Sequence, residues 1–385
     1  MLRQRRSPSS IEPASVVRCF ILLFAWSLLL PTSAAGVETM RIGMGTAPTE
    51  VTVRGKSLAC GVDAEDPVLK PLAHNRALVR RTAGGLEIDG APWPEKSVRF
   101  RAGGNEDSGG SSEELRLGDH RVRGDVVIRV ARSSLELINV LPLEEYVTGV
   151  LGSEMPPDFP EEALKAQAVA ARTYAVRRKL GSTEQPYHLG SSVLHQVYSG
   201  LDRENARVRA AVEATNGEVL TYDLEPIEAY FHAFCGGRTE SGLDALGRDL
   251  AYLQPVDCPC GRLASSRWEL TLPTSEVSSV LGRKEVAPLT VAARSRAGRV
   301  KALRLGHDPI DAATFRQLLG YSRLRSLWFD VVDEGRDGWV KISGHGYGHG
   351  AGLCQWGAKL HAESGWSYRQ ILQHYYPGTE LQRMY

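Results

Sequence analysis

The sequence predicts an α+β fold that contains more strand than helix. From about Met40 to Asn139, short runs of alternating apolar and polar residues are separated by Gly- and Ser-rich turns, which is typical of β-strands. The period then changes to helical spacing in two successive segments. Near the C-terminus, a strand, a glycine-rich turn and two short helical segments follow one another.

Residues 1–35 have the layout of a secretory signal peptide. Arginines precede the apolar run CFILLFAWSLLL, and small residues near Ala34 and Ala35 offer a cleavage site. This run is short for a membrane span, which needs about 20 apolar residues. We therefore expect a protein exported to the periplasm, cell wall or extracellular medium. The alternative is an uncleaved signal that anchors the protein to the membrane.

The rest of the chain is long enough for one large domain or two modest ones. We expect a β-rich N-terminal region at 40–118 and a second domain at 119–385. The stretch GGNEDSGGSSEE, residues 103–114, is either a loose hairpin tip or a domain boundary. The formal net charge is +1, which argues neither for nor against a polyanionic partner.

Helix signals are clearest in the middle and at the end of the chain. A helix beginning near Pro160 would have Asp158 as its cap, acidic residues in its first turn and basic residues in its last turn. Two shorter helices are expected, one capped within 308–311 and one capped by Ser367.

One acidic residue stands out in the short connection GSEMPP. Glu154 follows a helical segment, and Pro156 and Pro157 stiffen the chain after it. If apolar neighbours desolvate this carboxyl, its pKa rises and it can act as a general acid near neutral pH. The alternative is a solvated loop glutamate.

Long motifs then relate the chain to a known family. The segments LPLEEYVTGVLGSEMP, EEALKAQAVAARTYA, QVYSG, YFHAFCGGRTES and GHGYGHGAGLCQWGA occur in this order, followed by YRQILQHYYPGT. In these motifs the chain resembles the SpoIID/LytB family from about Val122 to the C-terminus. The segment from Met40 to Gly118 is similar to the β-rich lead-in of that family, more weakly.

The resemblance implies a peptidoglycan lytic transglycosylase, with the SEMP glutamate, here Glu154, as its catalytic acid and base. Such an enzyme needs one carboxyl where ordinary glycosidases need two, because the C6 hydroxyl of the sugar attacks C1 and forms a 1,6-anhydro ring. No cofactor is required for this reaction. The implied partners are peptidoglycan glycan strands and a cell-wall amidase, with no nucleic acid.

Several polar and aromatic side chains in the same motifs are candidates for lining a glycan groove, since sugar sites use both types. The candidate substrate-binding residues are Arg172, Tyr174, Gln196, Tyr198, His232, His349 and Gln355. The alternative for each is a structural role, such as an ion pair of Arg172 with Glu161 or Glu162, or a tyrosine in the core.

Four cysteines form a second candidate site: Cys235, Cys258, Cys260 and Cys354. One residue separates Cys258 from Cys260, so these two cannot easily pair with each other but can hold one metal ion together. Four thiolates, or three with His232, would make a structural zinc site. One or two disulfides are the alternative in an exported protein. Cys60 is expected to be unpaired and structural.

Two further interpretations compete with an enzyme. The first is a non-catalytic wall-binding protein that stimulates an N-acetylmuramoyl-L-alanine amidase, for which Glu154 would be dispensable. The second is a structural component of a cell-wall complex, with residues 40–115 as its docking surface.

Overall fold

The computed structural model describes residues 38–103, 113–182, 185–191, 196–283, 287–334 and 337–385. The expected signal peptide and most of the linker-like stretch lie outside these residues. Helices and a larger number of strands occur in the described part, which agrees with the expected α+β class. Within that part, no helix combines the length and the apolar content needed to cross a membrane.

The N-terminal β-rich part consists of two sheets that bury most of their apolar side chains in one cluster, while Val127, Ile138 and Val140 form a smaller one. The first sheet has the order β13 (Leu189–Gly190), β1 (Thr39–Ala47), β12 (Leu135–Pro142), β11 (Asp125–Val130), β8 (Ser97–Ala102), β3 (Leu58–Gly61) and β4 (Lys70–Pro71). The second has the order β10 (His120–Val122), β9 (Leu115–Leu117), β2 (Glu50–Gly55), β5 (Arg76–Thr82), β6 (Gly85–Ile88) and β7 (Ala91–Trp93). Alternate residues of β2 are buried, as the alternating sequence predicted.

The β-rich part continues beyond residue 118, where we expected it to end. β1 pairs antiparallel with β12, and β8 pairs with β11, so the first sheet contains strands from both sides of that position. β10 adds a strand to the second sheet in the same way. Strand pairing between distant segments thus carries the β-rich part on to Pro142, and a division at 118 would cut through both sheets.

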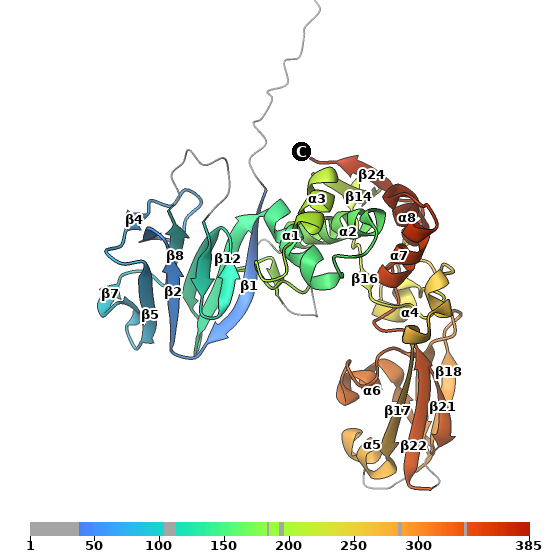
Figure 1. The fold of residues 1–385 in the computed structure, drawn as a ribbon. Coiled ribbons are helices and arrows are strands. Elements are labelled where there is room, and N and C mark those ends of the chain that lie inside the picture. The colour runs from blue at the N-terminus through green and yellow to red at the C-terminus, as the bar shows by residue number, and fades with distance from the viewer. Residues whose placement is uncertain (1–37, 104–112, 183–184, 192–195, 284–286, 335–336) are drawn as a thin grey trace, which may run out of the picture. The chain divides into compact units, whose positions relative to one another are not determined.

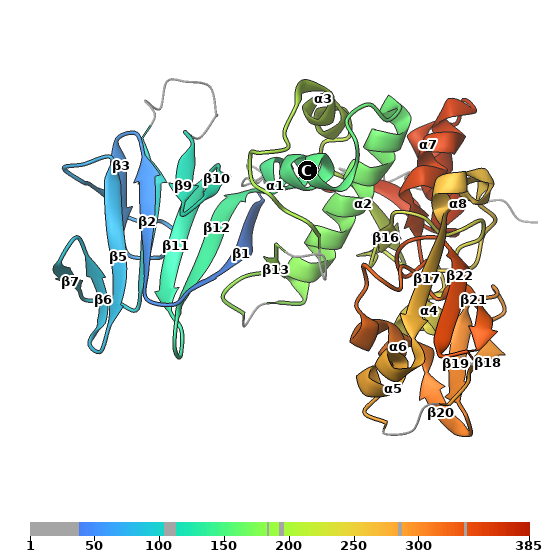
Figure 2. The ribbon, with the colours of Figure 1, turned by 60° about the horizontal axis from the view of Figure 1, so that its bottom comes forward.

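A long helix forms the centre of the next part. This helix, α2 (Glu161–Leu180), is in contact with α1 (Leu143–Glu154), α3 (Ala206–Ala214), α7 (Gln355–Glu363), α8 (Tyr368–Tyr375) and β14 (Glu218–Tyr222) (Figure 2). Its many alanines are buried because neighbours pack on several of its faces. The charged residues at its two ends lie as predicted, but it begins directly after Pro160 without a side-chain cap. The expected cap at Asp158 is therefore wrong.

Residues 267–345 form an inserted module (Figure 1). Its buried apolar side chains form a core of their own. One of its sheets has the order β17 (Arg267–Pro273), β22 (Trp339–His345) and β21 (Trp328–Glu334). The other has the order β18 (Leu289–Arg294), β19 (Val300–Leu305) and β20 (Asp308–Asp311). Helices α5 (Thr274–Val280) and α6 (Ala312–Leu319) complete it, and Asp311 caps α6 as predicted.

After the module the chain returns to the segment from which it departed. β23 (Leu353–Cys354) pairs in parallel with β16 (Phe231–His232). α7 and α8 follow, and a capping box of Ser367 and Gln370 begins α8, which confirms the predicted cap. The last strand, β24 (Glu380–Arg383), pairs with β14. The connection from β23 into α7 therefore lies in the same part of the structure as α2.

Candidate functional site

Glu154 is the last residue of α1 rather than a loop residue. Its Oε1 accepts a hydrogen bond of 2.8 Å from the backbone N–H of Val197. Its Oε2 lies 3.4 Å from Nε2 of Gln355, the first residue of α7. The carboxyl is thus held between two segments that are distant in sequence, one on each oxygen.

The surroundings of Glu154 favour its protonated form. Burial raises the pKa of this carboxyl, and the hydrogen bonds from Val197 and Gln355 oppose that rise without cancelling it. The carbonyl end of a helix carries partial negative charge, which also disfavours a carboxylate at this position. A carboxyl whose pKa is raised holds its proton to higher pH than an exposed glutamate does, which is the property that a general acid needs.

Gln196 and Tyr198 are both buried, and they fix the backbone on either side of Val197. The Gln196 amide accepts from the Tyr146 hydroxyl at 3.0 Å and donates to the Ala171 carbonyl at 3.2 Å. The Tyr198 hydroxyl donates to Asn139 at 2.8 Å. These two residues, predicted to contact glycan, instead position the amide that binds Glu154. We call residues 196–198 the clamp segment.

Arg172 and Tyr174 are also structural in this fold. The guanidinium of Arg172 is completely buried and binds both oxygens of Glu144 at 2.7 and 2.6 Å. It also donates to the backbone carbonyls of Glu218 and Val212. The alternative partners Glu161 and Glu162 bind Lys165 instead.

The ring of Tyr174 is buried, and its hydroxyl accepts hydrogen bonds from Arg178 at 3.0 and 3.1 Å. Because Arg172 is buried against α1 and β14, and Tyr174 is buried against Arg178 and Tyr230, the expectation that they line a groove does not fit the structure.

His232 and His349 lie against each other, with ring centroids 5.2 Å apart. Both are neutral: desolvation lowers the pKa of His349 to about 4 and takes that of His232 well below its usual range. Nδ1 of His349 accepts from the Ala351 amide at 3.1 Å, so its Nε2 donates to the Phe231 carbonyl at 2.9 Å. These contacts hold the glycine-rich turn against β16. Of the predicted substrate-binding residues, Gln355 is the one whose side chain contacts Glu154.

An aromatic group beside Gln355 escaped the sequence analysis. Trp356 is half-buried, stacks on Phe234 with ring centroids 4.9 Å apart, and makes an edge contact with Phe159 at 5.1 Å between centroids. Nζ of Lys359 lies 5.8 Å from the centroid of the Trp356 ring. A partly exposed tryptophan is a surface on which a sugar ring can stack, and this one directly follows the residue that contacts Glu154. In the sequence, the position of Trp356 directly after Gln355 in the glycine-rich motif was the feature that could have identified it.

The four predicted cysteines converge. The sulfurs of Cys235, Cys258, Cys260 and Cys354 all lie within 4.8 Å of one another, and all four residues are buried free thiols. Four thiolates around Zn²⁺ at about 2.3 Å place their sulfurs about 3.8 Å apart, so the group fits a tetrahedral zinc ion. His232 binds the Ala351 carbonyl through Nδ1 at 3.1 Å, and the converging group consists of the four cysteines without His232. Cys60 is buried apart from this cluster, in β3.

Hydrogen-bond donors surround the sulfur cluster. The amides of Cys235 and Gly357 donate to Sγ of Cys354 at 3.3 and 3.4 Å. The Tyr375 hydroxyl lies 3.1 Å from Sγ of Cys258. Such donors stabilise thiolate and orient it toward a metal. Cys354 also directly precedes Gln355, so the cysteine cluster and Glu154 meet at the start of α7.

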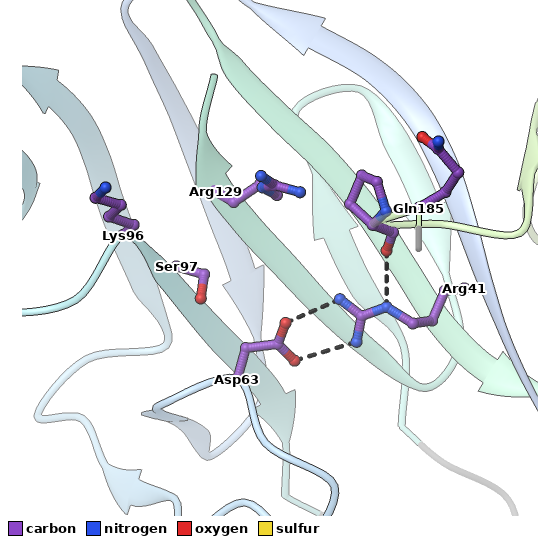
Figure 3. Close-up of a pocket in the computed structure, with 7 residues that line it drawn as sticks. Arg41, Asp63, Lys96, Ser97, Arg129 and Gln185 are labelled. Atoms are coloured by element: carbon purple, nitrogen blue, oxygen red, sulfur yellow. Dashed lines mark hydrogen bonds and ion pairs between the residues drawn. The ribbon is translucent and has the colours of Figure 1, made fainter. Parts of the chain in front are cut away.

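A separate cavity of about 370 Å³ lies beside the first sheet of the β-rich part (Figure 3). Its lining residues are Arg41, Asp63, Lys96, Ser97, Arg129, Gln185 and Pro186. Arg41 pairs with Asp63 at 2.8 Å and donates to the Pro186 carbonyl at 2.9 Å (Figure 3). Asp63 also pairs with Arg99 at 2.7 Å. The carboxylate of this cavity is thus occupied by internal pairs, and no predicted site residue lines it.

Known proteins match the chain over the part that contains Glu154 and beyond. Residues 131–222 match the model of a family described as SpoIID, stage II sporulation protein. The chain is 34% identical over 283 residues to stage II sporulation protein D of Bacillus amyloliquefaciens, which covers 66% of this chain and 78% of that protein. It is 30% identical over 343 residues to an uncharacterized protein of Brachyspira hyodysenteriae, which covers 87% and 90%. An amidase enhancer of Bacillus subtilis is 30% identical over 288 residues, which cover 60% of this chain and 40% of the enhancer.

Proposed function

Because the chain belongs to the SpoIID/LytB family, we propose that it is an exported peptidoglycan lytic transglycosylase with Glu154 as its acid and base. Its substrate would be the β-1,4 bond between N-acetylmuramic acid and N-acetylglucosamine in glycan strands stripped of their peptides. The observation that carries the proposal is the environment of Glu154, a partly buried carboxyl with a raised pKa at the meeting point of α1, the clamp segment and α7.

The proposed reaction uses this one carboxyl twice. The protonated Glu154 gives its proton to the glycosidic oxygen as the bond to C1 breaks. The resulting carboxylate then takes the proton of the C6 hydroxyl while that oxygen bonds to C1, which leaves a 1,6-anhydro-muramyl product and restores the acid. The hydrogen bond from Val197 would hold one oxygen of the carboxyl, and Gln355 would orient the other. Trp356, which follows Gln355 directly, would offer a stacking surface for a sugar ring.

The test is mass spectrometry of the sugars released from amidase-treated peptidoglycan. We expect 1,6-anhydro-muramyl products from the wild type and none from Glu154→Gln. Glu161→Gln, which changes an exposed glutamate in the first turn of α2, is the matched control and should retain activity. If the wild type releases no such product, the enzyme proposal is wrong.

The similarity to an amidase enhancer supports a second candidate, a glycan-binding protein that stimulates a cell-wall amidase. For that function Glu154→Gln would leave stimulation intact while no anhydro product appears with either chain. The same pair of proteins, assayed with a purified amidase, separates the two candidates.

We also propose that the four cysteines hold a structural zinc ion. The convergence of their sulfurs and the donors around them support this. The ion would connect the β16 region, the turn at Pro259–Arg262 and the start of α7, and would leave the glycosidic chemistry to Glu154. Metal analysis of the purified chain should give about one zinc per chain, and disulfide mapping tests the alternative.

A further inference from the structure

Arg299 brings a positive charge from the inserted module to the cysteine cluster. It lies between β18 and β19, and its side chain is 4% exposed. Nη2 donates to the carbonyl of Cys235 at 2.6 Å and to that of Arg238 at 3.0 Å. The glycine-rich turn leaves room for it, since a Cβ on Gly350 would come 2.5 Å from Nη2.

The guanidinium is not satisfied by its neighbours. Among the described residues, Nε and Nη1 are buried without a hydrogen-bond partner. Nη1 lies 3.8 Å from the buried carboxylate of Glu240, which instead accepts hydrogen bonds from Ser295 and from the Ser241 amide. The Trp328 ring covers the guanidinium at 5.2 Å. A buried cation left with unused donors calls for further negative charge nearby.

The cysteine cluster would supply that charge. Desolvation by burial lowers the pKa of Arg299, and negative charge on Cys235, Glu240, Cys354 and Cys260 would oppose that fall. Zinc bound by four thiolates carries a net charge of about −2, and a buried centre of this charge requires compensation. Amide donors supply part of it, and the Arg299 guanidinium, which also faces the Glu240 carboxylate, supplies a further part.

We propose that Arg299 is the counter-ion of a tetrathiolate metal centre, so that metal binding and docking of the inserted module stabilise each other. The inference rests on the zinc site proposed above. By thermodynamic linkage, whatever strengthens one of the two events strengthens the other. Because Cys354 precedes Gln355, the same centre connects the module to the residue that contacts Glu154.

Competition with a chromophoric chelator measures the zinc affinity of the full chain and of three variants. Arg299→Gln removes the charge and should weaken zinc binding by about 10–100-fold, as the loss of outer-shell partners commonly does. Arg299→Lys keeps the charge and should retain most of the affinity. The matched control is Arg316→Gln, a buried arginine of the same module that donates to the carbonyls of Leu324 and Arg325 at 2.8 and 2.6 Å. Its effect on the zinc affinity should be much smaller than that of Arg299→Gln.

Hydrogen exchange gives a readout that does not depend on activity. Removing zinc from the wild type should speed exchange at Gly346, whose amide donates to Ser266, and at Val300, whose amide donates to Leu327. In Arg299→Gln these amides should exchange fast with or without zinc. If Arg299→Gln does not fold, the zinc affinity of Arg299→Lys tests the proposal instead. This variant retains the positive charge, so a large loss of its affinity would overturn the proposal.

Three other outcomes would overturn it. Equal loss of affinity in Arg299→Gln and Arg316→Gln would mean that Arg299 acts only through the stability of the module. Unchanged affinity in Arg299→Gln would mean that its charge does not act on the metal. A wild type that binds no zinc would remove the centre itself, and the proposed glycan cleavage by Glu154 would stand unaffected.

Discussion

The amide of Val197 donates a 2.8 Å hydrogen bond to the carboxyl of Glu154, across 43 positions of sequence. This contact joins the end of α1 to a segment that carries no helix or strand. The flanking side chains of Gln196 and Tyr198 are both buried and hydrogen-bonded, so the amide is held in place by α1, α2 and β12. The geometry of the proposed acid therefore depends on residues that do not reach a substrate.

Replacing Glu154 by Gln should stabilise the protein at neutral pH. Burial raises the folded-state pKa above the ordinary 4.5, so the stability linked to protonation is complete below about pH 4.5 and is lost as pH rises through the folded pKa. The glutamine side chain stays neutral, so the variant loses no stability from this position as the pH rises. Urea unfolding at pH 4 and pH 7 should show a variant-minus-wild-type difference that grows with pH.

Glu161→Gln is a control for which the change of stability with pH should have the opposite sign. The hydrogen bond from Lys165 lowers the pKa of the Glu161 carboxyl, so its contribution is present above the unfolded pKa and is lost as pH falls. This carboxyl is exposed, and the effect should be small. A Glu154 difference that stays constant between the two pH values would show that the carboxyl is not perturbed.

Gln196→Leu should displace the pH–rate profile of glycan cleavage. Without its bonds to Tyr146 and Ala171, the clamp segment loses its anchor and the Val197 hydrogen bond weakens. That bond lowers the pKa of Glu154, so its loss raises the pKa and moves the alkaline limb of the profile upward.

Thr215→Val is a matched control for this variant. The Thr215 hydroxyl is buried and binds carbonyls of α3 alone, at Ala211 and Val212. Its profile should coincide with that of the wild type. A lower rate for Gln196→Leu with an unmoved profile would assign Gln196 a general structural role.

Arg172→Met should destabilise the fold by about 3 kcal/mol, because it leaves Glu144 and two backbone carbonyls without their buried partner. The measurement is urea unfolding, with Arg177→Met as the control at an exposed ion pair on the same helix. If Arg172→Met instead unfolds like the wild type and loses glycan binding, Arg172 contacts the substrate after all.

Gly357→Ala should abolish zinc binding. A Cβ at this position of α7 would collide with the Tyr375 hydroxyl and with Sγ of Cys258. Neither atom can move away without disturbing the sulfur cluster. Gly181→Ala is the control, since that glycine has φ −92° and no atom closer than 3.8 Å to the added carbon. Normal zinc content in Gly357→Ala would contradict the packing of α7 against the cysteines.

The sequence by itself determined the features that depend on neighbouring residues. The charged ends of α2, the caps at Asp311 and Ser367 and the strands of the β-rich part follow from local periodicity and capping chemistry. The motif around Glu154 and the four cysteines were visible in the same way.

Only the tertiary structure decided which distant groups meet. Arg172 pairs with Glu144, 28 positions away, and Cys354 meets Cys235 across 119 positions. The strands of 267–345 carry the same alternation as those of the N-terminal sheets, so nothing local revealed that they bury their apolar faces in a core of their own. Local patterns specify which face of an element is buried, whereas the identity of its partner depends on packing that the whole chain must satisfy at once.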